Sequence, residues 1–301
     1  MNRDLISLED LARRIDALKL WSKLVPYNWA LRPSRTVFPY FCEFLPPDRA
    51  EVKFRILLLE GWQTMHDYLR LRMDPSWSFF SSPLELNHYE VVLLANGESA
   101  FFRHDTGYVP RLLTPNEKEL LKKLLWEVYG MMLRMESDND LTLKYADEKS
   151  LFSRKETKAG WVDSPFEIVP MRPHVERISY RKDVIDKAKD LPLLKDKTIA
   201  LDLHILNGRA TRELRPRLIY ELRAVEEGSD EIFVLRHTSM DPESGLRGIW
   251  ETLANVVLEA FIAKGCVPGE IKVKSKRVFR MLRPLTIELS FKLSLHNELK
   301  V

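Results

Sequence analysis

The chain has 301 residues, which is enough for two ordinary domains that each bury a core of their own. With 45% hydrophobic and 30% charged residues, its composition excludes a disordered protein, and the lack of any run of 18 apolar residues excludes a membrane-spanning helix. The formal net charge of +3 is nearly neutral for this length.

The cysteine content is also low. Cys42 and Cys266 are too few for a disulfide framework, and they do not form the Cys-x-x-Cys pair of a metal knuckle. This usage is typical of a reducing compartment, so we expect a cytoplasmic protein.

Residues 1–136 are expected to form an N-terminal domain of mixed α and β structure. The prediction depends on apolar residues at helical spacing and on short runs of aromatic or branched residues. The predicted elements are a helix over 7–24, strands over 36–45 and 52–59, a helix over 60–71, a hairpin over 86–104 and a helix over about 114–135.

Two of these elements carry specific local signals. Asn96-Gly97 in the middle of the hairpin predicts a two-residue type I′ turn, because both residues tolerate the positive φ angles that this turn requires. Thr114 is expected to be the N-cap of the last helix, since Pro115 follows it and Glu117 takes the third helical position.

The middle of the chain, residues 137–195, has a different character. It contains four prolines and many charged residues with little periodicity. We therefore interpret it as a linker or wrapping arm, with a short helix near 181–190.

Residues 196–301 are expected to form a second domain with the order β-β-β-α-β-α-β. Its predicted elements are strands over 198–206, 216–226 and 231–239, a helix over 245–264, a strand over 270–274, a helix over 276–283 and a strand over 286–293. This order resembles the wiring of ribonuclease H-like folds, a group that includes retroviral-type integrase cores. The resemblance covers about residues 196–296 and implies a fold without implying an activity.

Two-metal nucleases of that group hold their ions between several carboxylates. Asp202 lies midway along the first predicted strand, where such a fold has its first carboxylate, and Glu251 or Glu259 on the long helix would supply another. Lys274, however, stands at the end of the fourth strand, where an acid is expected, and its charge would repel a metal ion. We therefore favour an Asp202 that faces solvent or pairs with an arginine of the second strand.

The strongest charge asymmetry lies within residues 264–283, which hold seven basic residues and one acidic residue. Strand alternation and helical spacing suggest one continuous cationic surface, suited to phosphates, although charge runs are more often solvated faces with local ion pairs. The residues proposed to bind an anion or nucleic acid are Lys272, Lys274, Lys276, Arg280 and Arg283.

The seven histidines show none of the spacings that are typical of metal ligands, such as His-x-x-x-His, so no metal site is expected. Two histidines are each followed by an aspartate, at His66-Asp67 and His104-Asp105. Each pair could be part of an acid/base dyad, although such residues are more often ordinary turn or cap residues. The sequence contains no glycine-rich phosphate loop and no nucleophile elbow, so no cofactor is expected.

Several phrases resemble a bacterial family of uncharacterised proteins that are known only as domains of unknown function, and the resemblance covers nearly the whole chain. They are LLLEGWQTMHDYLRLR (57–72), RHDTGYVPR (103–111), LLWEVYGMMLR (124–134), LKYADEKSLFSRKE (143–156) and FRMLRPLTIELSFKLSLHNEL (279–299). The resemblance implies a bacterial, intracellular protein. It implies no activity, cofactor or catalytic residue.

These observations predict a mixed α/β (α+β) protein of two domains. We expect a non-catalytic binding or scaffold protein whose cationic C-terminal surface takes a nucleic acid or an acidic protein partner. The alternatives are a divergent metal-dependent nuclease or hydrolase that uses Asp202, and a structural protein that assembles through exposed apolar surface. The substrate, the partner and the oligomeric state do not follow from the sequence.

Overall fold

The computed structural model describes residues 6–19, 29–47, 49–73, 85–138, 140–144, 147–171, 178–210, 214–228, 232–239, 241 and 246–296. Within these residues the chain forms six helices and two mixed β-sheets, which confirms the mixed α/β class. The chain divides into two compact units: unit 1 comprises residues 1–70, 79–106 and 110–172, and unit 2 comprises 71–78, 107–109 and 173–301. No helix in the described part of the chain is both long and apolar enough to span a bilayer.

Unit 1 is built on an eight-stranded sheet with the order β6-β5-β4-β3-β2-β1-β7-β8. The pairing of β1 with β7 is parallel, and all the other neighbouring strands are antiparallel. Its elements are α1 (Leu8–Leu18), β1 (Trp29–Arg32), β2 (Tyr40–Leu45), β3 (Val52–Glu60), α2 (Gly61–Arg72, which ends in unit 2), β4 (His88–Leu94), β5 (Ser99–His104), β6 (Arg111–Leu112), α3 (Pro115–Ser137), β7 (Ser150–Thr157) and β8 (Gly160–Glu167).

The two faces of this sheet are covered differently. One face packs against α1 and α3 in a core that includes Ile56, Leu58 and Val91. On the opposite face, the ring of Phe41 lies 4.7 Å from that of Trp62 in α2. Residues that alternate along one strand therefore face two distinct environments, the α1/α3 core or the α2 side.

Unit 2 is built on a five-stranded sheet with the order β11-β10-β9-β12-β13. Strand β9 pairs parallel with β12, and β12 with β13, whereas β10 is antiparallel to both of its neighbours. Its elements are α4 (Lys182–Lys189), β9 (Leu193–Ala210), β10 (Leu218–Glu226), β11 (Ile232–Ser239), α5 (Leu246–Lys264), β12 (Val267–Val273), α6 (Lys276–Leu289) and β13 (Lys292–Leu295).

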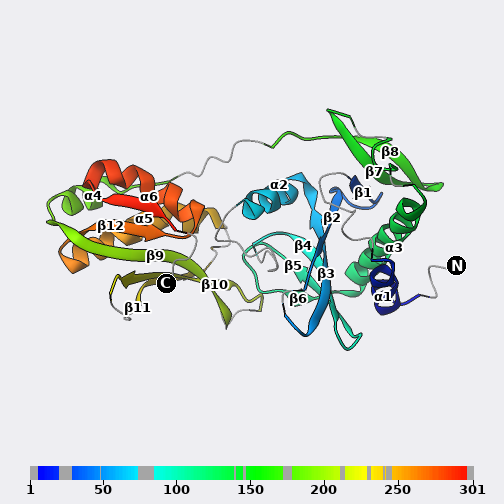
Figure 1. Ribbon diagram of the computed structural model, residues 1–301, viewed down its shortest axis with the longest axis horizontal. Coiled ribbons are helices and arrows are strands. Elements are labelled where there is room, and N and C mark those ends of the chain that lie inside the picture. Colours follow the sequence, from blue (N-terminus) through cyan, green and yellow to red (C-terminus); the bar gives the residue numbers. More distant parts are fainter. Residues whose placement is uncertain are drawn as a thin grey trace. The chain divides into compact units, whose positions relative to one another are not determined.

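The three helices of unit 2 share one core with one face of this sheet (Figure 1). Leu201 and Leu222 from the sheet meet Leu253 and Val257 of α5 and Met281 of α6 in that core. Because side chains alternate along a strand, the residues between these apolar positions point to the opposite face of the sheet. None of the three described helices of unit 2 packs there, so we call it the helix-free face.

The turn between β4 and β5 differs from the predicted type. Leu94 and Glu98 are the last hydrogen-bonded pair, with the amide of Leu94 2.9 Å from the carbonyl oxygen of Glu98, so the loop holds three residues. Gly97 has a φ of +86°, whereas Asn96 is not among the described residues with positive φ. The connection is therefore a turn followed by a left-handed glycine, and the predicted two-residue type I′ turn is wrong.

Residues 137–195 contain more regular structure than we predicted. Strands β7 and β8 form a hairpin within this interval, and β7 adds to the sheet of unit 1 beside β1. The hairpin is difficult to recognise because β8 carries Pro165 and its exposed positions alternate with only partly buried ones. The interpretation of most of this interval as a linker or wrapping arm is therefore corrected for residues 150–167, whereas the short helix predicted near 181–190 is present as α4.

Helix α6 is longer than the predicted segment 276–283. It continues through Pro284 to Leu289, and the last strand starts at Lys292 instead of residue 286. Proline removes one backbone donor from a helix interior, but Leu285 and Leu289 extend the buried stripe of α6 and their burial offsets that loss. The start of α3 matches its prediction, with a complete capping box between Thr114 and Glu117.

Candidate functional sites

The predicted carboxylates of unit 2 lie on different sides of the sheet. Asp202 is buried on β9, and its Oδ1 accepts a hydrogen bond of 2.9 Å from the backbone amide of Leu203. Leu201 belongs to the core beneath α5, so alternation directs Asp202 to the helix-free face. In the strand register, Asp202 stands opposite Arg223.

The other two candidates, Glu251 and Glu259, lie on α5 at eight residues from each other, which is about 12 Å along a helix axis. Glu259 is exposed and its Oε1 lies 3.2 Å from the guanidinium of Arg181. Among the described residues, Asp202, Glu251 and Glu259 do not form a group of converging ligands.

The predicted cationic residues also divide between two surfaces. Lys272 and Lys274 alternate with the buried Ile271 and Val273, so they point to the helix-free face. There, Lys272 Nζ lies 2.8 and 2.9 Å from the two carboxylate oxygens of Glu227, which neutralises its charge.

Arg280 and Arg283 are exposed on α6, whose buried stripe of Val278, Met281 and Leu285 packs into the core on the other side of the sheet. The sheet therefore separates them from Lys272 and Lys274, and the expectation of one continuous surface is wrong. What remains is a smaller group on the first three turns of α6, which we call the α6 cationic strip: Lys276, Arg280 and Arg283.

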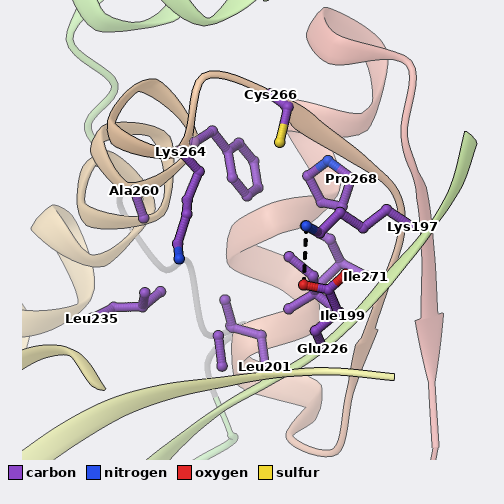
Figure 2. Close-up of a pocket in the computed structure, with 12 residues that line it drawn as sticks. Lys197, Ile199, Leu201, Glu226, Leu235, Ala260, Lys264, Cys266, Pro268 and Ile271 are labelled. Carbon is purple, nitrogen blue, oxygen red and sulfur yellow. Dashed lines mark ion pairs between the residues drawn. The ribbon is translucent and has the colours of Figure 1, made fainter. Parts of the chain in front are cut away.

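A small cavity lies between the sheet of unit 2 and α5 (Figure 2). It encloses about 60 Å³. Apolar side chains form most of its wall, and the lining residues with polar or ionisable side chains are Lys197, Glu226, Lys264 and Cys266. Lys197 Nζ lies 2.9 Å from Glu226 Oε2, so these two charges satisfy each other at the edge of the cavity. A specific small-molecule site needs convergent polar groups, and this cavity does not present them.

Unit 1 contains a polar cluster inside the sheet, on the face toward α2. His88 and Glu90 alternate on β4 and therefore share this face, and the strand register pairs His88 directly with His104 of β5. The two imidazole rings stack with centroids 4.1 Å apart and planes inclined by 17°. His104 Nε2 lies 2.6 Å from Glu90 Oε2, and Arg55 Nε of β3 lies 3.5 Å from Glu90 Oε1.

This cluster is deeply buried, with His88 0%, Glu90 5% and His104 1% exposed. Burial, followed by the neighbouring His104, lowers the pKa of His88 to about 3, so its imidazole is neutral at pH 7. His88 Nδ1 lies 2.8 Å from the carbonyl oxygen of Leu86, which accepts the ring proton and fixes the tautomer. His88 Nε2 is then an acceptor, and it has no hydrogen-bond partner among the described residues.

Unit 2 has a row of similar composition on the helix-free face of its sheet. Glu221 of β10 stands opposite His204 of β9 and His237 of β11. His237 Nε2 lies 2.5 Å from Glu221 Oε2, and Arg223 donates to the other oxygen of Glu221. His237 is 48% exposed, so this row remains in contact with solvent.

The two His–Asp pairs that were considered as parts of acid/base dyads take other partners. His104 turns to Glu90, while Asp105 lies 3.0 Å from the Nε of Arg103. Asp67, next to His66, lies 2.5 Å from an amino group of Arg70. Adjacent residues point to different sides of a strand, which explains why His104 and Asp105 have different partners.

The sequence prediction missed the cluster of unit 1 because it tested histidine spacings that suit helices. The relevant signal is His88-x-Glu90, a spacing of two on a strand, together with a histidine at the matching position across the hairpin. Comparison with known proteins gives no additional guide, since no family model, curated protein or solved structure matches the chain.

Proposed function

We propose that the chain is a non-catalytic binding or scaffold protein whose unit 2 binds nucleic acid through the α6 cationic strip. The observation that carries this proposal is the charge pattern of α6. Its first three turns bear Lys276, Arg280 and Arg283 on positions that are exposed or partly exposed, and its first acidic residue is Glu288, in the last turn.

The position of these charges on the helix supports an anionic partner. A helix N-terminus carries a partial positive charge, so basic side chains in the first turn are unfavourable there and acidic ones are preferred. The first turn of α6 contains no acidic residue, and the N-cap Ser275 accepts from the amides of Arg277 and Val278. A phosphate beside this turn would relieve the repulsion between the helix dipole and the basic side chains.

The proposal of a non-catalytic role is supported by the separation of Asp202 from Glu251 and Glu259, and by Lys274 at the end of β12. The order and directions of the strands in unit 2 also support our proposal that its topology is ribonuclease H-like. We further propose membership of the bacterial family of unknown function and a cytoplasmic location, on the phrases and the cysteine usage given above.

The test is binding of short labelled single- and double-stranded DNA and RNA, measured by fluorescence anisotropy across a salt series. We expect wild-type affinity to fall steeply with salt. Lys276→Glu/Arg280→Glu/Arg283→Glu should abolish binding or, at low salt, reduce the slope of log affinity against log salt by about 2 to 3 for three lost phosphate contacts.

The matched control is Lys272→Glu/Lys274→Glu, which reverses two charges on the other side of the sheet and should retain most of the binding. Equal loss in both variants would contradict the assignment to α6. No wild-type binding at low salt would overturn the nucleic-acid proposal, and an acidic protein partner would then be sought by pull-down with the same variants. Cleavage with Mn²⁺ that is lost in Asp202→Asn would show that unit 2 is catalytic instead.

A further inference from the structure

We infer that His88, Glu90 and His104 of unit 1 form a binding site for one divalent transition-metal ion, with Zn²⁺ as the best match to the ligands. In the described part of the chain, they are the one group of three His, Cys, Asp or Glu residues whose ligand atoms all lie within 4.8 Å of one another. This inference uses no residue of unit 2, so the experiments that test it are independent of those that test the proposed function.

The orientation of His88 is that of a metal ligand. Histidines that bind metals donate their second ring N–H to a carbonyl or carboxylate, which fixes the ring and directs the other nitrogen to the ion. His88 makes this contact through Nδ1 to the carbonyl oxygen of Leu86, at 2.8 Å. Its Nε2 is buried and lacks a hydrogen-bond partner among the described residues, so the acceptor that a cation would use is available.

Glu90 is held so that one oxygen faces the histidines. Arg55 Nε lies 3.5 Å from Oε1, and Oε2 lies 2.6 Å from His104 Nε2. Glu90 would thus bind an ion through Oε2 alone, while Arg55 orients the carboxylate from the other oxygen. A tetrahedral ion with bonds of about 2.1 Å separates its ligands by about 3.4 Å, so His104 and Glu90 would move apart slightly and His88 would approach them.

The donor set selects the class of ion. Two imidazoles and one carboxylate suit Zn²⁺ and its first-row neighbours, whereas Mg²⁺ and Ca²⁺ prefer sites of oxygen ligands alone. An ion bound at this site would cross-link β4 and β5 within the sheet. Because it binds the folded form, it should also raise the stability of unit 1.

The experiment uses the full chain after treatment with a chelator. Titration with Zn²⁺ by calorimetry should give one high-affinity ion per chain, and Co²⁺ should give an absorption spectrum that one equivalent of Zn²⁺ abolishes. His88→Asn preserves a donor for the Leu86 carbonyl but removes the Nε2 ligand, and His104→Gln preserves a donor for Glu90. We expect each variant to weaken Zn²⁺ binding by at least about tenfold.

The control is His237→Asn, which alters the other His–Glu pair on the surface of unit 2 and should leave Zn²⁺ affinity unchanged. Circular dichroism checks that each variant is folded. X-ray absorption of the wild-type Zn²⁺ complex should show two imidazole ligands, and this measurement needs no variant. Absence of wild-type binding, or affinity that His88→Asn and His104→Gln both leave unchanged, would overturn the site and show a purely hydrogen-bonded cluster.

Discussion

The sheets of the two units carry rows of nearly the same composition, two histidines, a glutamate and an arginine, in very different surroundings. In unit 1 the row is His88, Glu90, His104 and Arg55, and each of these residues is at most 7% exposed. In unit 2, Glu221 is buried beneath partners that reach solvent, since Arg223 is 29% and His237 48% exposed. Composition alone therefore does not decide what such a row can do.

Strand order explains why only one row converges. His88 and His104 lie on adjacent antiparallel strands, so their rings can stack. His204 and His237 lie on β9 and β11, which flank β10, and two strand spacings amount to about 9 to 10 Å. His237 bonds to Glu221 on the strand between them, but among the described residues His204, Glu221 and His237 do not form a group of converging ligand atoms.

The largest expected difference between the rows is the effect of removing the carboxylate charge. Glu90→Gln removes the carboxylate charge from the buried ion pair with Arg55, and breaking a buried ion pair costs about 3 to 5 kcal/mol. Glu221→Gln should cost about 1 kcal/mol or less, because Arg223 and His237 can turn to water. Amide hydrogen exchange in β4 and in β10, measured in the presence of a chelator, reports the stability of each unit separately.

This experiment tests the effect of burial, because the same Glu→Gln substitution is made in a buried row and in a solvent-exposed one. If Glu90→Gln and Glu221→Gln destabilise their units equally, burial is not what distinguishes the two rows. The measurement must resolve the units, because a chain with two cores does not have to unfold in one step.

The next largest effect is the pH dependence of the free energy of unfolding of unit 1. The pKa of His88 falls from 6.5 in the unfolded chain to about 3 in the folded one. The unfolded form therefore binds a proton first as the pH falls. The stability that is present above pH 6.5 is lost toward pH 3, with a slope that approaches about 1.4 kcal/mol per pH unit.

His88→Asn removes this titration but leaves Glu90, His104 and Arg103 around the position. Between pH 7.5 and 5.5 the wild type should thus lose about 1.4 kcal/mol more stability in unit 1 than the variant does. Urea unfolding at each pH, with a chelator present, measures the difference. Parallel curves for the two proteins would mean that His88 is not held neutral by the fold.

Much of the fold follows from local signals. The capping box at Thr114 and the apolar stripe of α5 need only neighbouring residues to be recognised, and the predicted bounds of both helices lie close to the observed ones. The hairpin of β7 and β8 was missed because β7 gains its place beside β1, more than 100 residues away in sequence, and local alternation gives little sign of that pairing. Pairings between distant strands depend on tertiary packing.

The candidate site could not be predicted because it depends on a register that differs by one residue from the expected one. A two-residue turn at Asn96-Gly97 would place His104 opposite Tyr89, on the α1/α3 face of the sheet. The observed three-residue loop places His104 opposite His88 instead. Since a slip of one residue moves every side chain to the other face, a single turn residue decides whether the cluster exists.

The smallest predicted effect tests that turn directly. Gly97 has a φ of +86°, and a Cβ added to it would meet no atom within 4 Å, so Gly97→Ala should cost about 1 kcal/mol through backbone strain alone. Gly130 in α3 has equally open space and no unusual φ, so Gly130→Ala should instead stabilise unit 1 by about 0.5 to 1 kcal/mol. Urea unfolding of the two variants gives both values. If Gly97→Ala is as harmless as Gly130→Ala, the loop tolerates another conformation, and the register that joins His88 to His104 is held by the strands and not by the turn.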